Sequence, residues 1–311
     1  MKKSIRIISP SGAINSEYIE GAIQRLQSWG YDITEGAYSR GIFGRFSGTD
    51  EERLEDLQEA LQDPTVEYIL CSRGGYGLQR ILNHIHAEIQ KCIIGFSDIT
   101  ALHQLCVVRH PDSTNQRQVS LHGLMCKHIA TLPEDSEAIR LFRKALAGES
   151  LSYEIPSHPL NRLGEATGTL IGGNLSVLYG LQDTPYSLNA ALDVHPEGCI
   201  LFIEDIGERH YHIDRMMHNL HMSGVLARIN GLVVGQFTDC DPDPLMAPLL
   251  LKHGNAIYST ILEAVEEYHY PILFNFPAGH VDDNRPLWMN GTTTIKISNH
   301  TSYLTQPSMY L

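Results

Sequence analysis

The chain has 311 residues and a formal net charge of −13. This length exceeds what one hydrophobic core usually holds, so we expect two domains. The negative charge and the absence of any Lys/Arg-rich run disfavour a nucleic-acid partner. The apolar run Ile5–Ile8 is too short for a signal peptide, and no segment has the length of a membrane-spanning helix. These features predict a soluble, cytoplasmic protein without a membrane partner.

The first half alternates strand and helix patterns. Residues Ser4–Ser9 predict a buried strand, and it is followed by a helix that Ser16 can cap and that Gly30 ends. Thr49 and Glu52 form a capping box at the start of another helix. Further strands are predicted at Tyr68–Cys71 and at residues 92–94. Alternating elements are typical of a parallel sheet covered by helices, so residues 1–150 are expected to be an N-terminal parallel-sheet α/β domain.

The second half follows a stretch with Gly, Ser and two prolines, and we place a linker at residues 151–164. Residues 165–311 are then expected to form a smaller, mixed α/β C-terminal domain. Strands are predicted at Gly168–Ile171, Cys199–Ile203, Leu232–Phe237, Ile272–Phe276 and Thr293–Ile297. Helices are predicted at Arg215–Met222 and Ala256–Tyr268 in this half, and at Leu124–Ala130 and Ser136–Ala147 before the linker. The six cysteines are scattered without a C-x-x-C pair, which is typical of free thiols in a reducing compartment.

Ser97 stands where an apolar strand runs directly into a helix pattern. A serine on such a turn projects its hydroxyl beyond the sheet, and the N–H groups of the helix start can stabilise a developing anion. Gly95, two residues earlier, allows the turn to be tight. Ile99 replaces the last glycine of the G-x-S-x-G pattern. Ser97 is therefore a candidate nucleophile, and the alternative is a simple helix N-cap.

A glycine-rich segment, Arg73-Gly74-Gly75-Tyr76-Gly77, follows the preceding strand. Backbone amides of such a loop can form a nest for a phosphate, a carboxylate or a tetrahedral oxyanion. The segment matches neither the G-x-G-x-x-G nor the P-loop pattern, which disfavours a nucleotide. A structural glycine turn is the alternative.

An acid and a histidine follow two strands of the second half. Glu204 and Asp205 end an apolar strand, at the edge where ligands bind to open α/β sheets. His280 follows Pro277-Ala278-Gly279 after another strand, a position that suits a general base. The alternatives are acids that solvate a strand end and an ordinary surface histidine.

The histidine pairs of the chain raise the question of a metal centre. The close pairs are His84/His86, His210/His212 and His218/His221. None lies in an H-E-x-x-H motif or beside a zinc-like set of acids and cysteines. We therefore expect neither a metal nor another cofactor.

Several blocks, in one order along the chain, resemble the LD-carboxypeptidases, a family that also includes the microcin C self-immunity peptidases. The blocks are residues 8–12, 46–49, 73–77, 95–98, 172–175, 201–205, 213–216 and 279–280. One departure is Asn284-Arg285-Pro286-Leu287-Trp288, where relatives usually have a Leu-Pro pair beyond the Asn.

The resemblance implies a metal-free triad of Ser97, Glu204 and His280, with an oxyanion hole made by the backbone N–H groups of Asp98 and Gly75. It implies a homodimer that releases C-terminal D-alanine from murein tetrapeptides during cell-wall recycling. Binding the terminal carboxylate is assigned to Arg73 or Gly74. A microcin-type acyl-sulfamoyl-adenylate peptidase and a non-catalytic anion-binding protein are the alternatives. The segment 163–173 has no aromatic insertion to stack an adenine, which favours murein peptides.

Overall fold

A computed structural model describes residues 3–109, 118–240 and 255–309 of the chain. The chain divides into two compact units of similar length. The first unit holds residues 1–149, 285–290 and 309–311, and the second holds residues 150–284 and 291–308. The second unit is the smaller by only a few residues, and the chain returns to the first unit near its end.

A six-stranded sheet forms the centre of the first unit. Its strand order is β11-β5-β4-β3-β1-β2, and β1 to β5 pair in parallel, whereas β11 is antiparallel to β5. The α/β fold class expected from the sequence is confirmed. The strands are β1 (Ser4–Ile8), β2 (Asp32–Glu35), β3 (Tyr68–Cys71), β4 (Cys92–Gly95), β5 (Ser120–His122) and β11 (Leu287–Met289).

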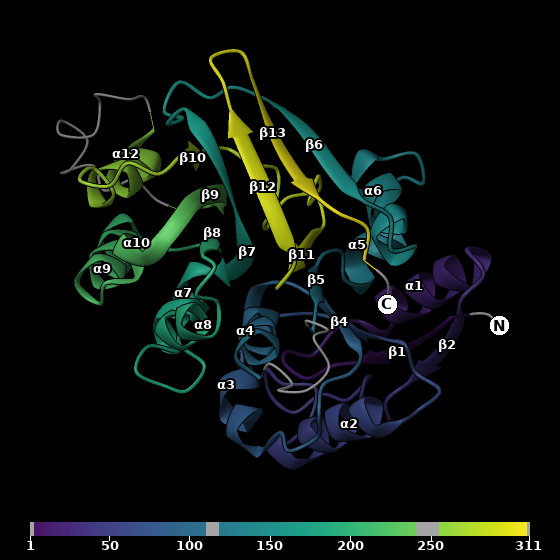
Figure 1. The fold of residues 1–311 in the computed structure, drawn as a ribbon. Helices are drawn as coiled ribbons and strands as arrows, with labels where there is room; N and C mark the ends of the chain where they lie inside the picture. Colours follow the sequence, from purple (N-terminus) through teal and green to yellow (C-terminus); the bar gives the residue numbers. More distant parts are fainter. Residues whose placement is uncertain (1–2, 110–117, 241–254, 310–311) are drawn as a thin grey trace. The chain divides into compact units, whose positions relative to one another are not determined.

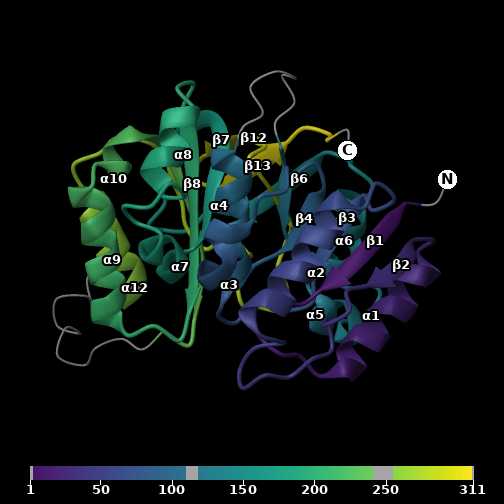
Figure 2. The same cartoon turned by 90° about the horizontal axis from the view of Figure 1, so that it is seen from below.

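Helices cover both faces of this sheet. They are α1 (Ser16–Ser28), α2 (Asp50–Gln62), α3 (Leu78–Ile81), α4 (Thr100–Val108), α5 (Cys126–Thr131) and α6 (Glu137–Leu146), with 3-10 helices η1 (Leu82–His84) and η2 (Ser97–Ile99). The direction of the crossovers reverses after β2, so right-handed connections place α1 on one face and α2, α3 and α4 on the other. Figures 1 and 2 show this division, with α1 beside α5.

The strand order β2-β1-β3-β4-β5 is that of a doubly wound sheet with its switch point between β1 and β3. Ligands bind such sheets outside the carboxyl ends of the strands, at the switch point. The segments that follow β1, β2, β3 and β4 therefore meet at the edge where a site is expected.

A seven-stranded mixed sheet forms the second unit, in the order β10-β9-β8-β7-β12-β13-β6. Strands β7 to β10 are parallel, and β12, β13 and β6 pair antiparallel. The bounds are β6 (Leu151–Pro156), β7 (Gly164–Asn174), β8 (Cys199–Ile206), β9 (Ile229–Thr238), β10 (Ile272–Leu273), β12 (Thr292–Ile297) and β13 (Thr301–Gln306). The mixed architecture predicted for this half is confirmed.

The helices of the second unit are α7 (Leu175–Gly180), α8 (Leu188–Val194), α9 (His210–Met222), α10 (Val225–Arg228) and α12 (Ala256–Ala264). Strands β7, β8, β9 and β10 follow one another in a single direction across the sheet, so right-handed crossovers place these helices on one face. Figure 1 shows them together beside β7 to β10. None of the helices in the described ranges is long and apolar enough to cross a membrane.

Local signals in the sequence have mixed outcomes. The capping box of Thr49 and Glu52 at the start of α2 is confirmed, with both reciprocal hydrogen bonds present. Helix α1 is capped by Asn15, not by Ser16, because the Asn15 side chain accepts from the N–H of Glu17. Residues 151–164, predicted to be a linker, include strand β6 at the end of the second sheet.

Candidate active site

Ser97 lies on a strained turn between β4 and η2. Its φ is +66°, a left-handed value that few residues other than glycine adopt. The expected alternative, a serine N-cap, does not describe it: η2 begins at Ser97 itself, with Phe96 at the cap position and no side-chain cap bond. The strained backbone and the half-buried position are typical of a nucleophile held at a sheet edge.

The glycine-rich loop packs directly against this serine. A Cβ on Gly74 would lie 2.7 Å from the Cβ of Ser97 and 3.0 Å from its Oγ, so only glycine fits there. Gly75 has φ +112° and is exposed, and its neighbour Gly77 has φ +138°. Gly74 and Ser97, predicted to belong to one site, are thus brought together within the first unit.

Asp98 holds the serine turn in place through its side chain, a contribution that sequence reasoning missed. Its Oδ2 accepts hydrogen bonds from Ser11 Oγ at 2.7 Å and from the N–H of Leu78 at 3.0 Å. These bonds tie the turn after β4 to the segments after β1 and β3. Burial raises the pKa of the Asp98 carboxyl, and the two hydrogen bonds and the charge of Arg53 oppose that rise. The N–H of Asp98 lies in the first turn of η2, where N–H groups have no partner within the helix.

Arg73 is exposed, and its Nη1 donates to the backbone oxygen of Ala13 at 2.7 Å. The guanidinium makes no ion pair with an acid among the described residues. It is therefore available to bind an anion beside the glycine loop.

Glu204 and His280 form a hydrogen-bonded pair in the second unit. His280 Nδ1 lies 2.8 Å from Glu204 Oε2, and the Glu204 side chain is fully buried. Glu204 stands in a bulge of β8, where the register with β9 shifts between Ile203 and Asp205. Because the carboxylate is an acceptor, it selects the tautomer with the proton on Nδ1. The pair can therefore present Nε2 as a base.

Small residues and an asparagine shape the surroundings of this pair. A Cβ on Gly279 would lie 2.9 Å from Glu204 Oε2, and one on Gly235 would lie 3.1 Å from the Cβ of Glu204. The N–H of Gly279 donates to Asn284 Oδ1 at 2.9 Å, and Thr238 Oγ1 donates to the backbone oxygen of His280 at 3.0 Å. Asn284, fully buried five residues beyond Gly279, had been noted in the sequence only as the start of the segment that departs from the family pattern.

Asp205 has a different set of partners from Glu204, drawn from the segment after β7. Its Oδ1 accepts from Asn174 Nδ2, the N–H of Ile206 and Ser176 Oγ, and its Oδ2 accepts from the N–H of Ser176. Burial, followed by the nearby charge of Glu204, raises the pKa of Asp205 to about 7. No separate role was predicted for Asp205 from the sequence, although Asn174, directly before a helix, is a common capping signal.

Two of the three histidine pairs considered as metal ligands have other contacts. His210 Nε2 is bonded to Thr260 Oγ1 at 2.7 Å, and His212 Nδ1 to Glu208 Oε2 at 2.8 Å. His218 pairs with Asp214, and His221 bonds the hydroxyl of Tyr268. Among the residues that the structure describes, no group of three or more His, Cys, Asp or Glu is arranged to hold a metal ion.

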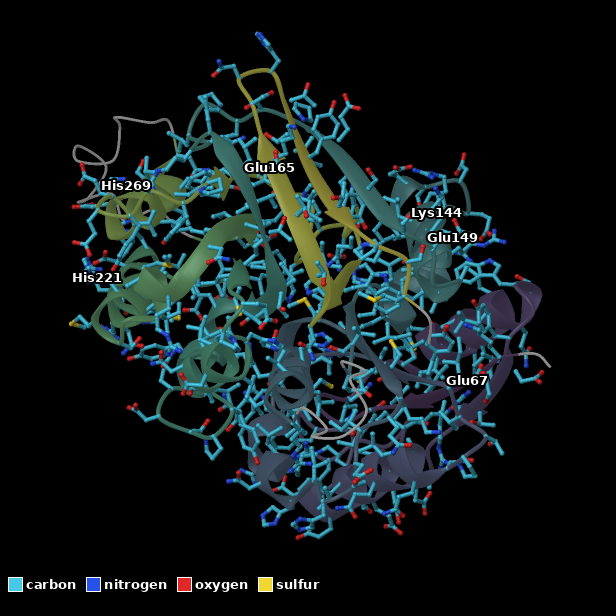
Figure 3. The ribbon with its side chains drawn as sticks, viewed as in Figure 1. Glu67, Lys144, Glu149, Glu165, His221 and His269 are labelled. Atoms are coloured by element: carbon cyan, nitrogen blue, oxygen red, sulfur yellow. The ribbon has the colours of Figure 1, made fainter. Side chains whose placement is uncertain are left out.

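Two surface hollows, one in each unit, are lined by residues other than the predicted site residues. The larger, of about 600 Å³, includes Trp29, Tyr31, Lys144 and Glu149, and the smaller, of about 340 Å³, includes His221 and Glu263. Figure 3 labels Lys144 and Glu149 near the end of α6, and His221 on α9. Neither hollow is lined by a predicted site residue.

The first unit thus holds a doubly wound sheet with a strained serine, and the second holds a buried acid–histidine pair. Side chains of these kinds occur in hydrolases that use a serine, a histidine and an acid. Comparison with known proteins specifies the class. Residues 5–113 match the LD-carboxypeptidase N-terminal domain, and residues 167–295 match the LD-carboxypeptidase C-terminal domain. The chain belongs to the LD-carboxypeptidase family.

Curated relatives match over most of their length. The chain is 29% identical to the murein tetrapeptide carboxypeptidase of Pseudomonas aeruginosa, over 95% of this chain and 93% of that protein. It is 32% identical to a probable murein peptide carboxypeptidase of Bacillus subtilis, over 89% and 83%.

Solved structures agree with this family. The crystal structure of muramoyltetrapeptide carboxypeptidase from Oxalobacter formigenes matches with a TM-score of 0.84 at 26% identity, over 99% of this chain and 100% of that one. The microcin C7 self-immunity protein matches with a TM-score of 0.78 over 99% and 97%, and at 19% identity it shows the fold alone.

Proposed function

We propose that the protein is a serine carboxypeptidase that releases C-terminal D-alanine from murein tetrapeptides. The observation that carries this proposal is the Glu204–His280 pair, with 2.8 Å between Oε2 and Nδ1, at a strand end in a member of the LD-carboxypeptidase family. The relatives named for murein peptides support the choice of substrate.

The first half of the reaction forms an acyl-enzyme. Ser97 Oγ attacks the carbonyl carbon of the L-centred residue, diaminopimelate or lysine, that precedes the terminal D-alanine. His280 Nε2 removes the hydroxyl proton and then donates it to the departing amine of D-alanine. Glu204 keeps the imidazole in the reactive tautomer and stabilises the imidazolium that forms. These reaction steps require that Ser97 and His280 act in one site in the working enzyme.

The second half of the reaction returns the serine. Water, activated by His280, attacks the acyl-enzyme, and the tripeptide leaves with a new carboxylate. In both halves the negative charge on the carbonyl oxygen is assigned to the backbone N–H groups of Asp98 and Gly75. The strained turn of Ser97 and the positive φ of Gly75 support this assignment. Arg73, with Gly74 beside the serine, is assigned to the terminal carboxylate of the substrate.

Replacing Ser97 by alanine tests the nucleophile and produces the largest expected loss. Release of D-alanine from a synthetic tetrapeptide, followed by mass spectrometry, should fall by a factor on the order of 10⁴ or more. Ser28 is an exposed serine at the end of α1, and Ser28→Ala is the matched control, which should retain full activity. Retained turnover in Ser97→Ala, with an unchanged circular dichroism spectrum, would end the nucleophile assignment.

Two further measurements separate this proposal from its alternatives. Treatment with EDTA should leave the rate unchanged, and activity lost to EDTA and restored by zinc would favour a metal centre. A parallel assay with an acyl-sulfamoyl adenylate tests the microcin-type activity, whose support is the shared fold alone. Peptide binding without turnover would favour a non-catalytic anion-binding protein.

We also assign the enzyme to the cytoplasm and to a homodimer, as the family resemblance implies. All six cysteines are free and five are buried, which is in keeping with a reducing compartment. Light scattering coupled to size exclusion tests the dimer, and a mass near that of one 34.8 kDa chain would refute it.

A further inference from the structure

The segment after β2 carries an arginine at the edge where the glycine loop and Ser97 lie. Phe43 and Phe46 exchange two backbone hydrogen bonds, of 2.8 and 3.0 Å, and so close a tight hairpin. Gly44, with φ +62°, and Arg45 form its tip. Arg45 is exposed. Because β2 is part of the doubly wound sheet, its carboxyl-end segment lies on the ligand side of the sheet.

Backbone contacts connect this hairpin to the nucleophile. The N–H of Ala13 donates to the backbone oxygen of Arg45 at 3.1 Å, and the N–H of Gly12 donates to that of Gly74 at 3.1 Å. A Cβ on Gly12 would lie 3.0 Å from the oxygen of Gly74 and 3.5 Å from that of Arg45. Gly74 in turn touches Ser97. Three successive contacts, through the segment after β1 and the glycine loop, therefore connect the backbone of Arg45 to the serine.

The guanidinium of Arg45 is oriented by an aromatic ring. It lies 5.8 Å from the ring centroid of Tyr76, a residue of the glycine loop, and that ring also contacts Phe46. Tyr76 is 46% exposed, and the neighbouring Ile42 and Phe43 are 78% and 59% exposed. The ring and these apolar side chains form a solvent-facing border on the hairpin side of the glycine loop.

Arg45 differs from Arg40 and Arg80 in lacking an acidic partner among the described residues. Arg40 forms ion pairs with Glu35 and Glu20, and Arg80 forms one with Asp50. Within the described ranges, Arg45 has no ion pair with an acid. No described acidic side chain therefore neutralises the positive charge of Arg45.

We propose that Arg45, held against Tyr76, binds a carboxylate of the substrate upstream of the bond that is cleaved. This inference rests on the proposed function. In a murein tetrapeptide the γ-linked D-glutamate, two residues before the terminal D-alanine, keeps a free α-carboxylate. Two extended residues span about 7 Å, so this carboxylate lies close to the bond that Ser97 attacks, on the ligand side of the sheet where Arg45 stands. Arg45 thus determines specificity for an acidic, rather than amidated, second residue.

Two tetrapeptides that differ only at this carboxylate test the assignment. One carries D-isoglutamate and the other D-isoglutamine at the second position. Arg45→Gln should raise KM for the isoglutamate peptide about 10-fold, with kcat within about twofold, as expected for one charged hydrogen bond. KM for the isoglutamine peptide should change little. Arg45→Lys should restore part of the difference, and Arg40→Gln, which removes an arginine already paired with acids, should change neither KM.

The outcomes separate the two proposals. If the wild-type enzyme cleaves the peptides and Arg45→Gln leaves both KM values unchanged, or raises them equally, the assignment of Arg45 is overturned and the proposed function stands. If the wild-type enzyme releases no D-alanine from either peptide, the proposed function fails and this assignment fails with it. Melting temperatures equal to that of the wild type exclude a loss of folding as the cause.

Discussion

Each unit of the molecule has a buried aspartate directly after a proposed catalytic residue. Asp98 follows Ser97 in the first unit, and Asp205 follows Glu204 in the second. Each carboxylate accepts a hydrogen bond from a backbone N–H in the first turn of a neighbouring helix, Leu78 in α3 and Ser176 in α7. Each aspartate thus connects the strand end that carries a proposed catalytic side chain to the start of the helix that follows the neighbouring strand.

The two aspartates differ in how many of their oxygens accept hydrogen bonds. At Asp98 both donors reach Oδ2. At Asp205 three donors reach Oδ1 and a fourth reaches Oδ2. An asparagine keeps one acceptor oxygen and replaces the other with a donor. It can therefore substitute for Asp98, whereas at Asp205 its NH₂ group would face an N–H or an O–H donor.

The charges around the two aspartates also differ. The fully buried guanidinium of Arg53 lowers the pKa of Asp98 and so opposes the effect of burial. Beside Asp205 the nearby charge is that of Glu204, which raises the pKa further, to about 7. In the second unit, Asp205 and Glu204 are therefore two buried carboxyl groups next to each other. In the first unit, the cation of Arg53 partly compensates the burial of Asp98. This contrast gives different expectations for substitutions in the two units.

Of the three acidic residues compared here, Glu204 should give the largest effect when it is replaced by glutamine, because the change removes the charge that supports His280. A glutamine can present its NH₂ group to Nδ1 and select the wrong tautomer, so kcat should fall about 10³- to 10⁴-fold while KM changes little. Steady-state kinetics on the tetrapeptide measures this.

Glu197→Gln is the matched control for that substitution. Glu197 also pairs with a histidine, His195, at 3.1 Å, but it precedes the start of β8 and so lies at the other end of the strand from Glu204. Its replacement should leave kcat within about twofold. If both variants lost activity equally, the special role of Glu204 would be untenable.

Much of the fold could be predicted because continuous apolar runs mark strands that are buried on both faces. Strands β3, β4, β8 and the centre of β9 are of this kind. Strand β6 was missed although Leu151, Tyr153 and Ile155 alternate as buried residues, because flanking glycine and proline residues favoured a linker. The buried face of β13 includes Ser302 and Gln306, so its pattern is weak. The short strand β11 joins the first unit from a distant part of the chain, which periodicity cannot predict.

The site could be predicted in part for a related reason. Strand-end positions and glycines indicate where a catalytic group can stand, so Glu204 and His280 were selected together and lie in contact. The supporting bonds could not be predicted, because they join residues far apart in the sequence. Ser11 and Asp98 are 87 positions apart, and Asn174 and Asp205 are 31 apart. Only the packing of neighbouring strand ends places such residues together.

Asp205→Asn should have an intermediate effect. An amide would leave at least one buried donor without an acceptor, at a cost of about 1–3 kcal/mol, and would disturb the backbone beside Glu204. We expect kcat to fall about 10-fold and the free energy of unfolding to decrease. Denaturant titrations and kinetics check both. A variant with wild-type stability and rate would show that the four hydrogen bonds are unimportant.

The pH dependence of the same variant sharpens the test. The pKa of Asp205 is raised in the folded protein from its ordinary value of 3.8 to about 7, so the folded state binds a proton more tightly than the unfolded state. The raised pKa of Asp205 therefore adds to the free energy of unfolding in full below about pH 4, and this addition is lost as the pH rises to about 7. Asparagine does not titrate. The stability deficit of Asp205→Asn relative to the wild type should therefore be largest near pH 4 and shrink toward pH 8.

Asp98→Asn should have the smallest effect of the three. The amide oxygen can occupy the position of Oδ2 and accept from both Ser11 Oγ and the N–H of Leu78, so kcat should stay within about threefold of the wild type. Asp98→Ala removes both bonds and leaves two buried donors unsatisfied, at about 1–3 kcal/mol each, and it should lower both stability and kcat. Parallel kinetics on the two variants decides the point. If the asparagine variant were as impaired as the alanine variant, the charge of Asp98, rather than its acceptor oxygen, would hold the Ser97 turn, and the contrast with Asp205 would disappear.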